Sequence, residues 1–404
     1  MISMSMRRCA VAFALGLAAG CSAPPVPMPE PPSPAPVPSA APASWVGTWG
    51  TAVQHGGRSF QDHTVRQIVH TSIGGDSARV RFSNEFGSGP LVIGSAYLAH
   101  RAGGGTVTDS RPVMFGGATT VTVPAGQTAV SDEVAFTVPA DGDVAVTVHL
   151  PTTAGGTVHG IAVQDTYVAS GDQAAAGGLS GAKTESSWYF LSGLDVRNAG
   201  AAGAVVAFGA SITDGFGSRF NGNQRWPDLL ADRLRAAGYT VGVLNAGISG
   251  NRLTVDDRGE SALNRFERDV LSRPGARWVI ISDDAINDLG AADPPSTAEL
   301  IGALGTLVER AHGAGLRVIC STLTPYEGAG YWTARGESAR GEINAFLRGP
   351  GSGCDAVLDA DRATHDPSAP TRYRRAYDSG DHLHPGAAGL QAIADAVPLD
   401  VFTR

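Results

Sequence analysis

The 404-residue sequence contains a single lysine, Lys183, so almost all of its positive charge is arginine. It has no basic run, and its formal net charge at pH 7 is -8. Schiff-base chemistry needs a lysine, and nucleic-acid binding needs a basic surface. The composition therefore argues against both, and it predicts no nucleic-acid partner.

HExxH, CxxC and P-loop spacings are also missing, so the sequence implies no metal and no nucleotide cofactor. It has only four cysteines. Two of them, Cys320 and Cys354, lie near predicted strands in the C-terminal half. The sequence leaves two states open for them, a disulfide bond or two buried free thiols.

The apolar run near the N-terminus, residues 9–19, is too short to span a bilayer as a helix. It follows Arg7 and Arg8 and overlaps the stretch LAAGC, which ends at Cys21. This pattern resembles the lipobox of bacterial lipoproteins, in which the chain is cut before a cysteine that is then acylated. The resemblance implies a signal peptide over residues 1–20 and a membrane anchor on Cys21, on the extracytoplasmic side. The alternative is an ordinary secretory signal with an incidental cysteine.

Two changes of composition divide the rest of the chain. Residues 21–44 are proline-rich and predict a semi-rigid linker. Residues 45–198 alternate apolar and polar residues, as in Val144, Val146 and Val148, and are punctuated by Gly, Asp and Pro. This pattern predicts an antiparallel, jelly-roll-like β-sandwich.

Residues 199–404 alternate strand and helix patterns, which predicts an α/β domain with a parallel sheet covered on both faces. One predicted helix begins after Ser296. Ser296 and Glu299 have the spacing of a capping box. A buried strand over 204–209 ends at Gly209 and is followed by Ser211. Open parallel sheets hold their ligands at the carboxyl ends of their strands. Ser211 is thus either a nucleophile or a helix N-cap.

Three further segments follow predicted strands or precede the last helix: LNAGISGNRL, DDAINDLG and SGDHLHPGAAG. Together with GASITDG they resemble the four blocks of the SGNH hydrolases, also called the GDSL esterase/lipase family. The resemblance covers roughly the last 200 residues, and the β-rich front with WVGTWGTA is similar to the accessory domain of an exported bacterial branch. It implies a flavodoxin-like, three-layer α/β/α domain and serine ester hydrolysis.

The resemblance assigns a role to each matching residue. Ser211 matches the nucleophile, His384 the base, and Asp381 the carboxylate that orients the base. The backbone N–H groups of Ser211 and Gly250 and the side-chain amide of Asn287 match the oxyanion donors. A serine needs such a base, and the developing oxyanion needs such donors.

His382 competes with His384 for the role of base. It is adjacent to Asp381, and neighbouring side chains in an extended segment point in opposite directions. His384 is therefore preferred. The other eight histidines are predicted to be surface or packing residues.

The sequence departs from the family pattern at two motifs. Ala210 replaces the usual Asp before the nucleophile, and Ala285 replaces a usual Gly. Asp283 and Asp284 stand where this branch usually has an apolar residue and Glu. They are interpreted as substrate contacts, solvated residues or catalytic carboxylates. In an esterase, a negative charge at this position would oppose the transition state unless it is solvated or paired. Replacing Asp283 by Asn should then keep ester hydrolysis within about tenfold or raise it modestly.

We therefore predict an exported esterase acting on carbohydrate or lipid esters, and the sequence does not name the ester. Tyr326, Tyr331 and Trp332 are candidates to line the mouth of the site, although aromatic residues more often pack in cores. Two alternatives stay open. One is a glycoside hydrolase on a repurposed SGNH fold, using Asp283, Asp284 or Asp381. The other is a non-catalytic, glycan-binding surface lipoprotein.

Overall fold

A computed structural model describes residues 44–403 of the chain. The predicted signal peptide, the lipidation site Cys21 and the proline-rich linker up to residue 43 lie outside the described residues. Within the described part, no helix combines the length and the apolar character needed to cross a membrane.

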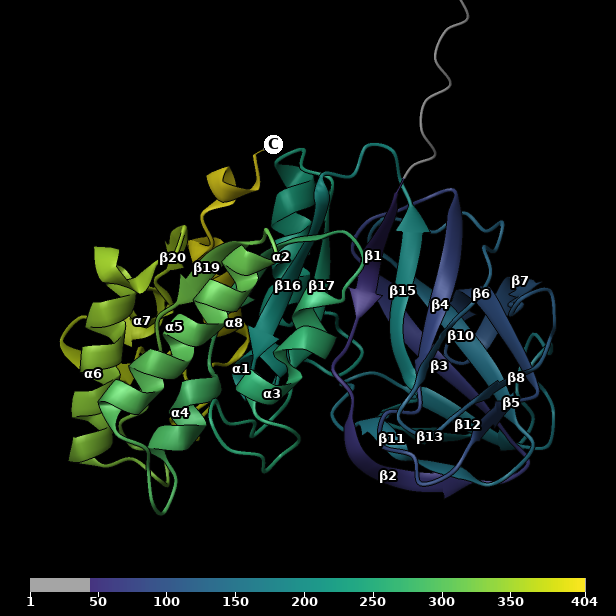
Figure 1. Cartoon of the computed structure of the whole chain (residues 1–404), viewed down its shortest axis with the longest axis horizontal. Helices are drawn as coiled ribbons and strands as arrows, with labels where there is room; N and C mark the ends of the chain where they lie inside the picture. Colours follow the sequence, from purple (N-terminus) through teal and green to yellow (C-terminus); the bar gives the residue numbers. More distant parts are fainter. Residues whose placement is uncertain (1–43, 404) are drawn as a thin grey trace, which may run out of the picture. The chain divides into compact units, whose positions relative to one another are not determined.

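Antiparallel sheets make up the N-terminal region, as the alternating pattern predicts (Figure 1). The largest sheet has the order β13 (Lys183–Glu185), β12 (Thr166–Ser170), β3 (His63–Thr71), β10 (Gly142–Leu150), β6 (Ser95–Gly103), β7 (Thr106–Pro112). A second sheet has the order β1 (Trp45–Gly50), β15 (Leu191–Arg197), β4 (Ser77–Ser83), β9 (Thr128–Val130). Smaller sheets contain β14 (Trp188–Tyr189), β11 (Ala154–His159) and β2 (Gln54–Phe60), and the pair β5 (Leu91–Ile93) and β8 (Val121–Val123).

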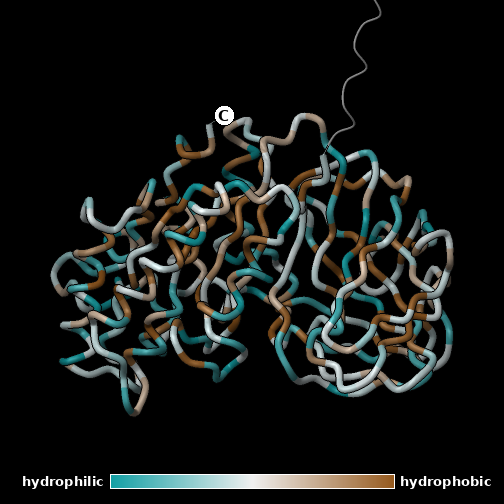
Figure 2. The backbone as a smooth tube through the Cα atoms, viewed as in Figure 1, coloured by the Kyte–Doolittle hydropathy of each residue, from teal (hydrophilic) through white to brown (hydrophobic). Residues whose placement is uncertain are grey.

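The central strand β10 shows how the alternation builds this core. Val144, Val146 and Val148 are fully buried in the main hydrophobic cluster. Ala145, which points to the opposite face, packs in a smaller cluster with Ile68. Figure 2 shows hydrophobic stretches along the strands of this region and hydrophilic ones in many of its loops.

The C-terminal region contains the predicted parallel sheet. Its strand order is β17 (Val241–Gly247), β16 (Gly203–Gly209), β18 (Ala276–Ile281), β19 (Arg317–Ser321), β20 (Ala356–Leu358). In sequence order this is 2-1-3-4-5, the flavodoxin-like arrangement. The first three strands end beside one another, so their carboxyl ends bring three separate loops together.

Helices cover both faces of this sheet. In order they are α1 (Ser211–Asp214), α2 (Trp226–Ala236), α3 (Ala262–Phe266), α4 (Asp284–Leu289), α5 (Thr297–Gly313), α6 (Ala334–Arg348), α7 (Ala360–Thr364), α8 (Ala387–Ala396). A π-helix, η1 (Glu267–Leu271), continues α3, while two 3-10 turns, η2 (Pro350–Ser352) and η3 (Leu399–Phe402), and a hairpin of β21 (His365–Asp366) and β22 (Ala369–Tyr373) complete the region.

Alternate residues of β16 pack against helices on opposite faces of the sheet, which gives three layers: helices, sheet, helices. Val205 and Ala207 pack in a cluster with residues of α2 and α8. Val206 and Phe208 pack in the cluster that holds residues of α3, α5 and α6. The predicted capping box is confirmed, because Ser296 accepts from the N–H of Glu299 and Glu299 bonds back to Ser296.

The two regions meet along β1 and β17. The N–H of Gly47 donates to the carbonyl oxygen of Pro274 at 3.0 Å. A Cβ on Gly242 would overlap the carbonyl oxygen of Gly47, so the two backbones touch because Gly242 has no side chain. The main hydrophobic cluster continues across this contact, from sandwich residues to Leu244.

The two cysteines whose state the sequence left open form a disulfide. Cys320 lies in β19, and Cys354 lies two residues before β20. Their Cα atoms are 5.8 Å apart. The bond joins two neighbouring strands of the parallel sheet.

Candidate active site

The turn after β16 presents Ser211 as the first residue of α1. Gly209 ends the strand, and a Cβ there would overlap the side chains of Asp283 and Thr213. Helical hydrogen bonding leaves the first N–H groups of a helix without partners inside it. The N–H of Ser211 occupies such a position, beside its own hydroxyl.

His384 meets Ser211 across the carboxyl edge of the sheet. Its Nε2 lies 2.9 Å from Ser211 Oγ, and its Nδ1 lies 2.7 Å from Asp381 Oδ2. A carboxylate only accepts hydrogen bonds, so Asp381 places the ring proton on Nδ1. Nε2 is then free to accept the hydroxyl proton of Ser211.

Asp381 is held in its charged form by N–H groups of the short turn that joins it to His384. Burial alone would raise the pKa of Asp381, but N–H donors oppose it and keep that pKa well below its usual value. The donors are the main-chain N–H groups of His384 at 2.8 Å and Leu383 at 3.0 Å, together with the imidazole. The rival base, His382, bonds to Asp378 at 2.6 Å instead, with a side chain 52% exposed.

Gly250 and Asn287 come from the loops after β17 and β18. Gly250 has a φ of 80°, a conformation in which L side chains are strained. Asn287 lies in α4, and its Nδ2 donates to the carbonyl oxygen of Asn251 at 2.8 Å. The hydroxyl of Tyr331 lies 3.4 Å from Asn287 Oδ1. These two contacts set the orientation of the amide, whose Nδ2 has a second proton to offer.

Buried charged groups fix the loop that carries Gly250. Asp288 accepts from the N–H of Leu253 at 2.6 Å and from Thr254 Oγ1 at 2.7 Å. Asp214 accepts from the N–H and the hydroxyl of Ser249, at 2.9 and 2.6 Å. The loop is therefore attached on both sides of Gly250.

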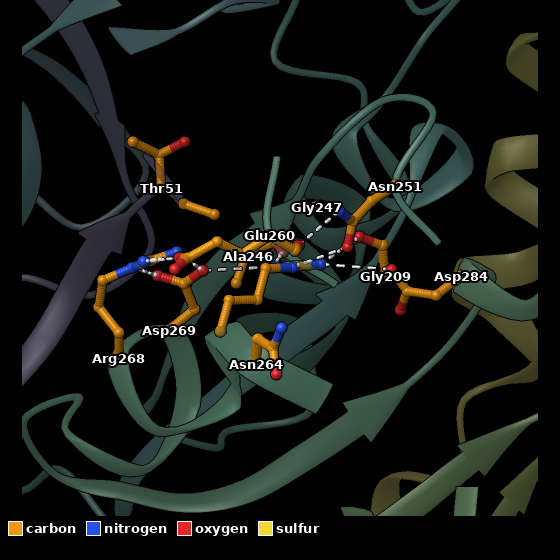
Figure 3. Close-up of polar contacts among 12 residues, drawn as sticks. Thr51, Gly209, Ala246, Gly247, Asn251, Glu260, Asn264, Arg268, Asp269 and Asp284 are labelled. Atoms are coloured by element: carbon orange, nitrogen blue, oxygen red, sulfur yellow. Dashed lines mark hydrogen bonds and ion pairs between the residues drawn. The ribbon is translucent and has the colours of Figure 1, made fainter. Parts of the chain in front are cut away.

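Arg265 of α3 ties the same loop to the ends of two strands. It is fully buried and donates to the carbonyl oxygens of Gly209 and Ala246, at 2.9 and 2.6 Å, and to Asn251 Oδ1 at 2.8 Å. Figure 3 shows the surrounding polar contacts, which extend from Arg268, Asp269 and Glu260 to Asn251 and Asp284. One guanidinium thus links the nucleophile strand to the oxyanion loop.

The acidic pair, Asp283 and Asp284, lies among these buried polar contacts. Asp283 accepts from the N–H groups of Ala210 and Ile212, at 3.1 and 2.8 Å, and from Thr213 Oγ1 at 2.6 Å. It is 4% exposed. The interpretation of Asp283 as a solvated residue is therefore wrong, and its oxygens brace the nucleophile turn instead of facing a substrate.

Asp284 is also buried, and one of its oxygens lies 3.3 Å from Arg265. Burial raises the pKa of Asp284 to about 7, although the charge of Arg265 opposes the shift. The structure gives neither carboxylate of the pair the open position that a substrate contact or a glycosidase acid would need.

Residues 207–392 match the model of the GDSL-like lipase/acylhydrolase family. They form a GDSL-like lipase/acylhydrolase domain. This match identifies the region as an SGNH-type hydrolase domain. No curated protein matches the chain.

Solved structures similar to the chain cover about half of it. One is described as a lipolytic G-D-S-L family protein of Desulfitobacterium hafniense, with 22% identity over 48% of this chain and 96% of that chain, and a TM-score of 0.38. Another is an acetylxylan esterase of Geobacillus stearothermophilus, with 22% identity, 49% and 93% coverage, and a TM-score of 0.38. A third is an α/β hydrolase from the metagenome of Lake Arreo, with 23% identity, 48% and 93% coverage, and a TM-score of 0.38.

The three aromatic residues that we predicted at the mouth of the site, Tyr326, Tyr331 and Trp332, differ from one another in burial. Tyr326 is fully buried beside Ile286 and does not line an opening. Tyr331 and Trp332 are half-buried in the same cluster. Tyr331 is the one of the three that contacts Asn287. Burial raises the pKa of Tyr326 to about 12, so its phenol stays protonated.

Sequence reasoning missed an aromatic residue that packs against His384. The ring of Phe216 lies 4.4 Å from the ring of His384, centroid to centroid, and its side chain is 41% exposed. Phe216 follows Gly215, which ends α1 in a left-handed conformation. The signal was present in the motif, since TDGF continues the nucleophile block directly.

Arg265 and His159 were also missed. Arg265 gave no signal, because arginine is usually exposed. His159 was grouped with surface and packing histidines, yet it is buried with its Nε2 3.0 Å from Asp214. Among the described residues, no group of three or more His, Cys, Asp or Glu side chains is arranged to hold a metal ion.

Proposed function

We propose that the chain is an exported, membrane-anchored serine esterase that hydrolyses carboxylic esters through an acyl-enzyme on Ser211. The observation that carries the proposal is the continuous hydrogen-bonded series from Asp381 through His384 to Ser211, with distances of 2.7 and 2.9 Å. A serine, a base and an orienting carboxylate in this geometry are the parts of a nucleophilic triad.

In the first step, Ser211 Oγ attacks the ester carbonyl carbon while its proton passes to His384 Nε2. Asp381 stabilises the imidazolium that forms. The carbonyl oxygen becomes negative and is met by the N–H groups of Ser211 and Gly250 and by the amide of Asn287. Each such donor is worth about 10²–10³ in rate. Collapse of the intermediate breaks the ester bond, and His384 returns its proton to the departing alcohol.

In the second step, water replaces the alcohol. His384 takes a proton from water, whose oxygen attacks the acyl carbon on Ser211. Collapse of this intermediate releases the carboxylic acid, and the proton on Nε2 returns to Ser211 Oγ. Proton and atom counts close over the two steps, so no metal or other co-reactant is needed.

The position of Phe216 supports an alcohol part with a broad face. His384 protonates the leaving alcohol, so that alcohol lies next to the imidazole. Phe216 packs against the same imidazole and leaves much of its ring exposed. Aromatic rings contact the apolar faces of sugars and the chains of lipids alike, so we propose a carbohydrate O-acyl ester or a lipid ester as substrate.

The first test is Ser211→Ala, with Ser218→Ala on the same loop as the matched control. We expect Ser211→Ala to lose hydrolysis of p-nitrophenyl acetate and labelling by a fluorophosphonate, while the control keeps both. The same enzyme, assayed on acetylated sugars and on longer acyl esters, separates the two substrate classes. Full esterase activity in Ser211→Ala would disprove the mechanism.

The proposed anchor is supported by the LAAGC motif and by the disulfide, since disulfides persist in oxidising compartments. Its test is Cys21→Ser, with Cys9→Ser as the control inside the signal peptide. We expect only Cys21→Ser to move the protein from membranes to the soluble fraction. Unchanged membrane association of Cys21→Ser would contradict lipidation at this residue.

A further inference from the structure

A histidine from the sandwich reaches into the base of the hydrolase site. His159 ends β11, is buried, and places Nδ1 2.8 Å from the carbonyl oxygen of Ala52. Its Nε2 lies 3.0 Å from Asp214 Oδ1. Both ring nitrogens thus face acceptors, and only the imidazolium has a proton on each. Burial by itself lowers the pKa of His159, but Asp214 and Ala52 raise it above its ordinary value.

Asp214 connects that histidine to both parts of the catalytic machinery. It is the last residue of α1, the short helix that begins with Ser211. Its Oδ2 accepts from the N–H of Ser249 at 2.9 Å and from the hydroxyl at 2.6 Å. Ser249 directly precedes the oxyanion donor Gly250. The carboxylate therefore fixes the distance between the nucleophile helix and the donor.

We propose that His159 is a positioning residue, which the β-sandwich supplies to hold Asp214 and, through it, the oxyanion loop at Gly250. The inference rests on the proposed function of Ser211 and adds a sandwich residue to its machinery. In this view the sandwich completes the active site, in addition to any role in binding.

Charge balance explains why the histidine is needed. A buried carboxylate is costly without a compensating charge. The other cation beside Asp214 is Arg225, whose Nε donates to the carbonyl oxygen of Asp214 at 3.1 Å and whose Nη2 donates to Ala162. Arg225 also lies over the ring of Trp188. Its donors are directed to the main chain and to the carboxylate of Asp228, so His159 makes the direct bond to the carboxylate of Asp214.

The loop has a second attachment that His159 does not influence. Asp288 holds Leu253 and Thr254, beyond Gly250. Loss of His159 should therefore loosen the Ser249 side of the loop and leave the far side attached. A local displacement of one donor predicts a loss in kcat more than in KM, because the oxyanion develops only in the transition state.

The test is His159→Gln in the whole chain, which keeps one amide donor but removes the charge. We expect kcat per active site, counted by fluorophosphonate titration, to fall about 10- to 100-fold, with KM within about threefold. The matched control is His149→Gln, a sandwich histidine that bonds to Asp62 at 3.0 Å. We expect it to keep wild-type kcat. An unchanged kcat per titrated site in His159→Gln would overturn the proposal.

Charge balance itself is tested by the double variant His159→Gln/Asp214→Asn, which is neutral on both sides. Since His159 acts through Asp214, the loss of kcat in the double variant should be smaller than the product of the losses in the two single variants. If the kcat loss of the double variant equals the product of the two single-variant losses, the link between His159 and Asp214 is contradicted.

A second measurement does not depend on ester hydrolysis. Amide hydrogen exchange of residues 244–254 should become faster in His159→Gln and stay unchanged in His149→Gln. Unchanged exchange around Ser249 and Gly250 in His159→Gln would overturn the positioning role, whether or not the protein hydrolyses an ester. A wild-type enzyme that neither hydrolyses esters nor reacts with the fluorophosphonate would overturn the proposed function alone.

Discussion

The two halves of the candidate site are built in opposite ways. The acid–base half is one turn, in which Asp381 and His384 are three residues apart and Asp381 is 45% exposed. The nucleophile and oxyanion half is held by buried groups far apart in sequence. Asp283 and Thr213 are separated by 70 residues, and Arg265 and Gly209 by 56. The pair of Asp381 and His384 is thus organised locally, whereas the turn of Ser211 and the proposed oxyanion donors depend on contacts across the fold.

Asp381→Asn breaks the local half and should have the largest effect. The amide cannot hold the imidazole in the required tautomer or stabilise its charged form, so we expect kcat to fall about 10³- to 10⁴-fold. The side chain is exposed enough that folding should be preserved. Steady-state kinetics and circular dichroism provide the measurement, with His382→Asn as a control that keeps kcat within about threefold. Asp381→Asn with near wild-type kcat would remove Asp381 from the triad.

Asp283→Asn tests the non-local half, and here the structure reverses the sequence-based expectation. The N–H groups of Ala210 and Ile212 donate to different oxygens of Asp283, so an amide keeps an acceptor for one of them and turns its NH₂ group toward the other. Losing a hydrogen bond to a charged group costs about 1.5–3 kcal/mol, so kcat should fall about 10- to 100-fold. Kinetics on p-nitrophenyl acetate measure the effect, and a kcat within threefold of wild type would contradict the bracing role.

Tyr331→Phe is a milder change to the same half. It removes the hydroxyl 3.4 Å from Asn287 Oδ1 and leaves the ring in place. One neutral hydrogen bond is worth about 0.5–1.5 kcal/mol, and at this length we expect kcat to fall about two- to fivefold. Tyr326→Phe is the matched control, because its buried hydroxyl has no partner among the described residues. Equal effects in the two variants would argue against a role for Tyr331 in orienting Asn287.

Asp284→Asn should have the smallest effect on kcat and a pH-dependent effect on stability. The pKa of Asp284 is raised to about 7 in the folded chain, so the unfolded chain loses this proton first as pH rises. The carboxyl thus destabilises the fold progressively from about pH 4 to pH 7. Thermal unfolding should show Asp284→Asn gaining several degrees in Tm over wild type across that interval, and no further gain above it. A constant difference would show that Asp284 is already charged.

The local half was predictable because sequence neighbours carried it. The D-x-x-H spacing placed Asp381 and His384 in bonding distance, and a strand followed by Gly and Ser placed Ser211 at the sheet edge. The alternation of strands and helices predicted the parallel sheet and its two covered faces. Each of these inferences rested on patterns of residues that are near one another in sequence.

The non-local half was not predictable, since its partners come from separate elements. Ala210 looked like the loss of a carboxylate from the nucleophile turn, and Asp283 looked like an unexplained charge. The structure brings the two together, so that Asp283 supplies a carboxylate to the backbone of Ala210. His159 ends strand β11 and lies 55 residues before Asp214 of helix α1, and no spacing rule connects them. Such pairs appear only when the tertiary fold is known.

The contact between Gly47 and Gly242 sets a condition on recombination between related chains. A side chain at Gly242 would push β1 away from β17, because a Cβ there overlaps the carbonyl oxygen of Gly47. A Cβ on Gly47 would in turn press on Leu244. A sandwich and a hydrolase half exchanged between two ancestors would dock only if both matching surfaces stayed free of side chains at this point. The close approach of the two halves at this point therefore depends on glycine at both positions.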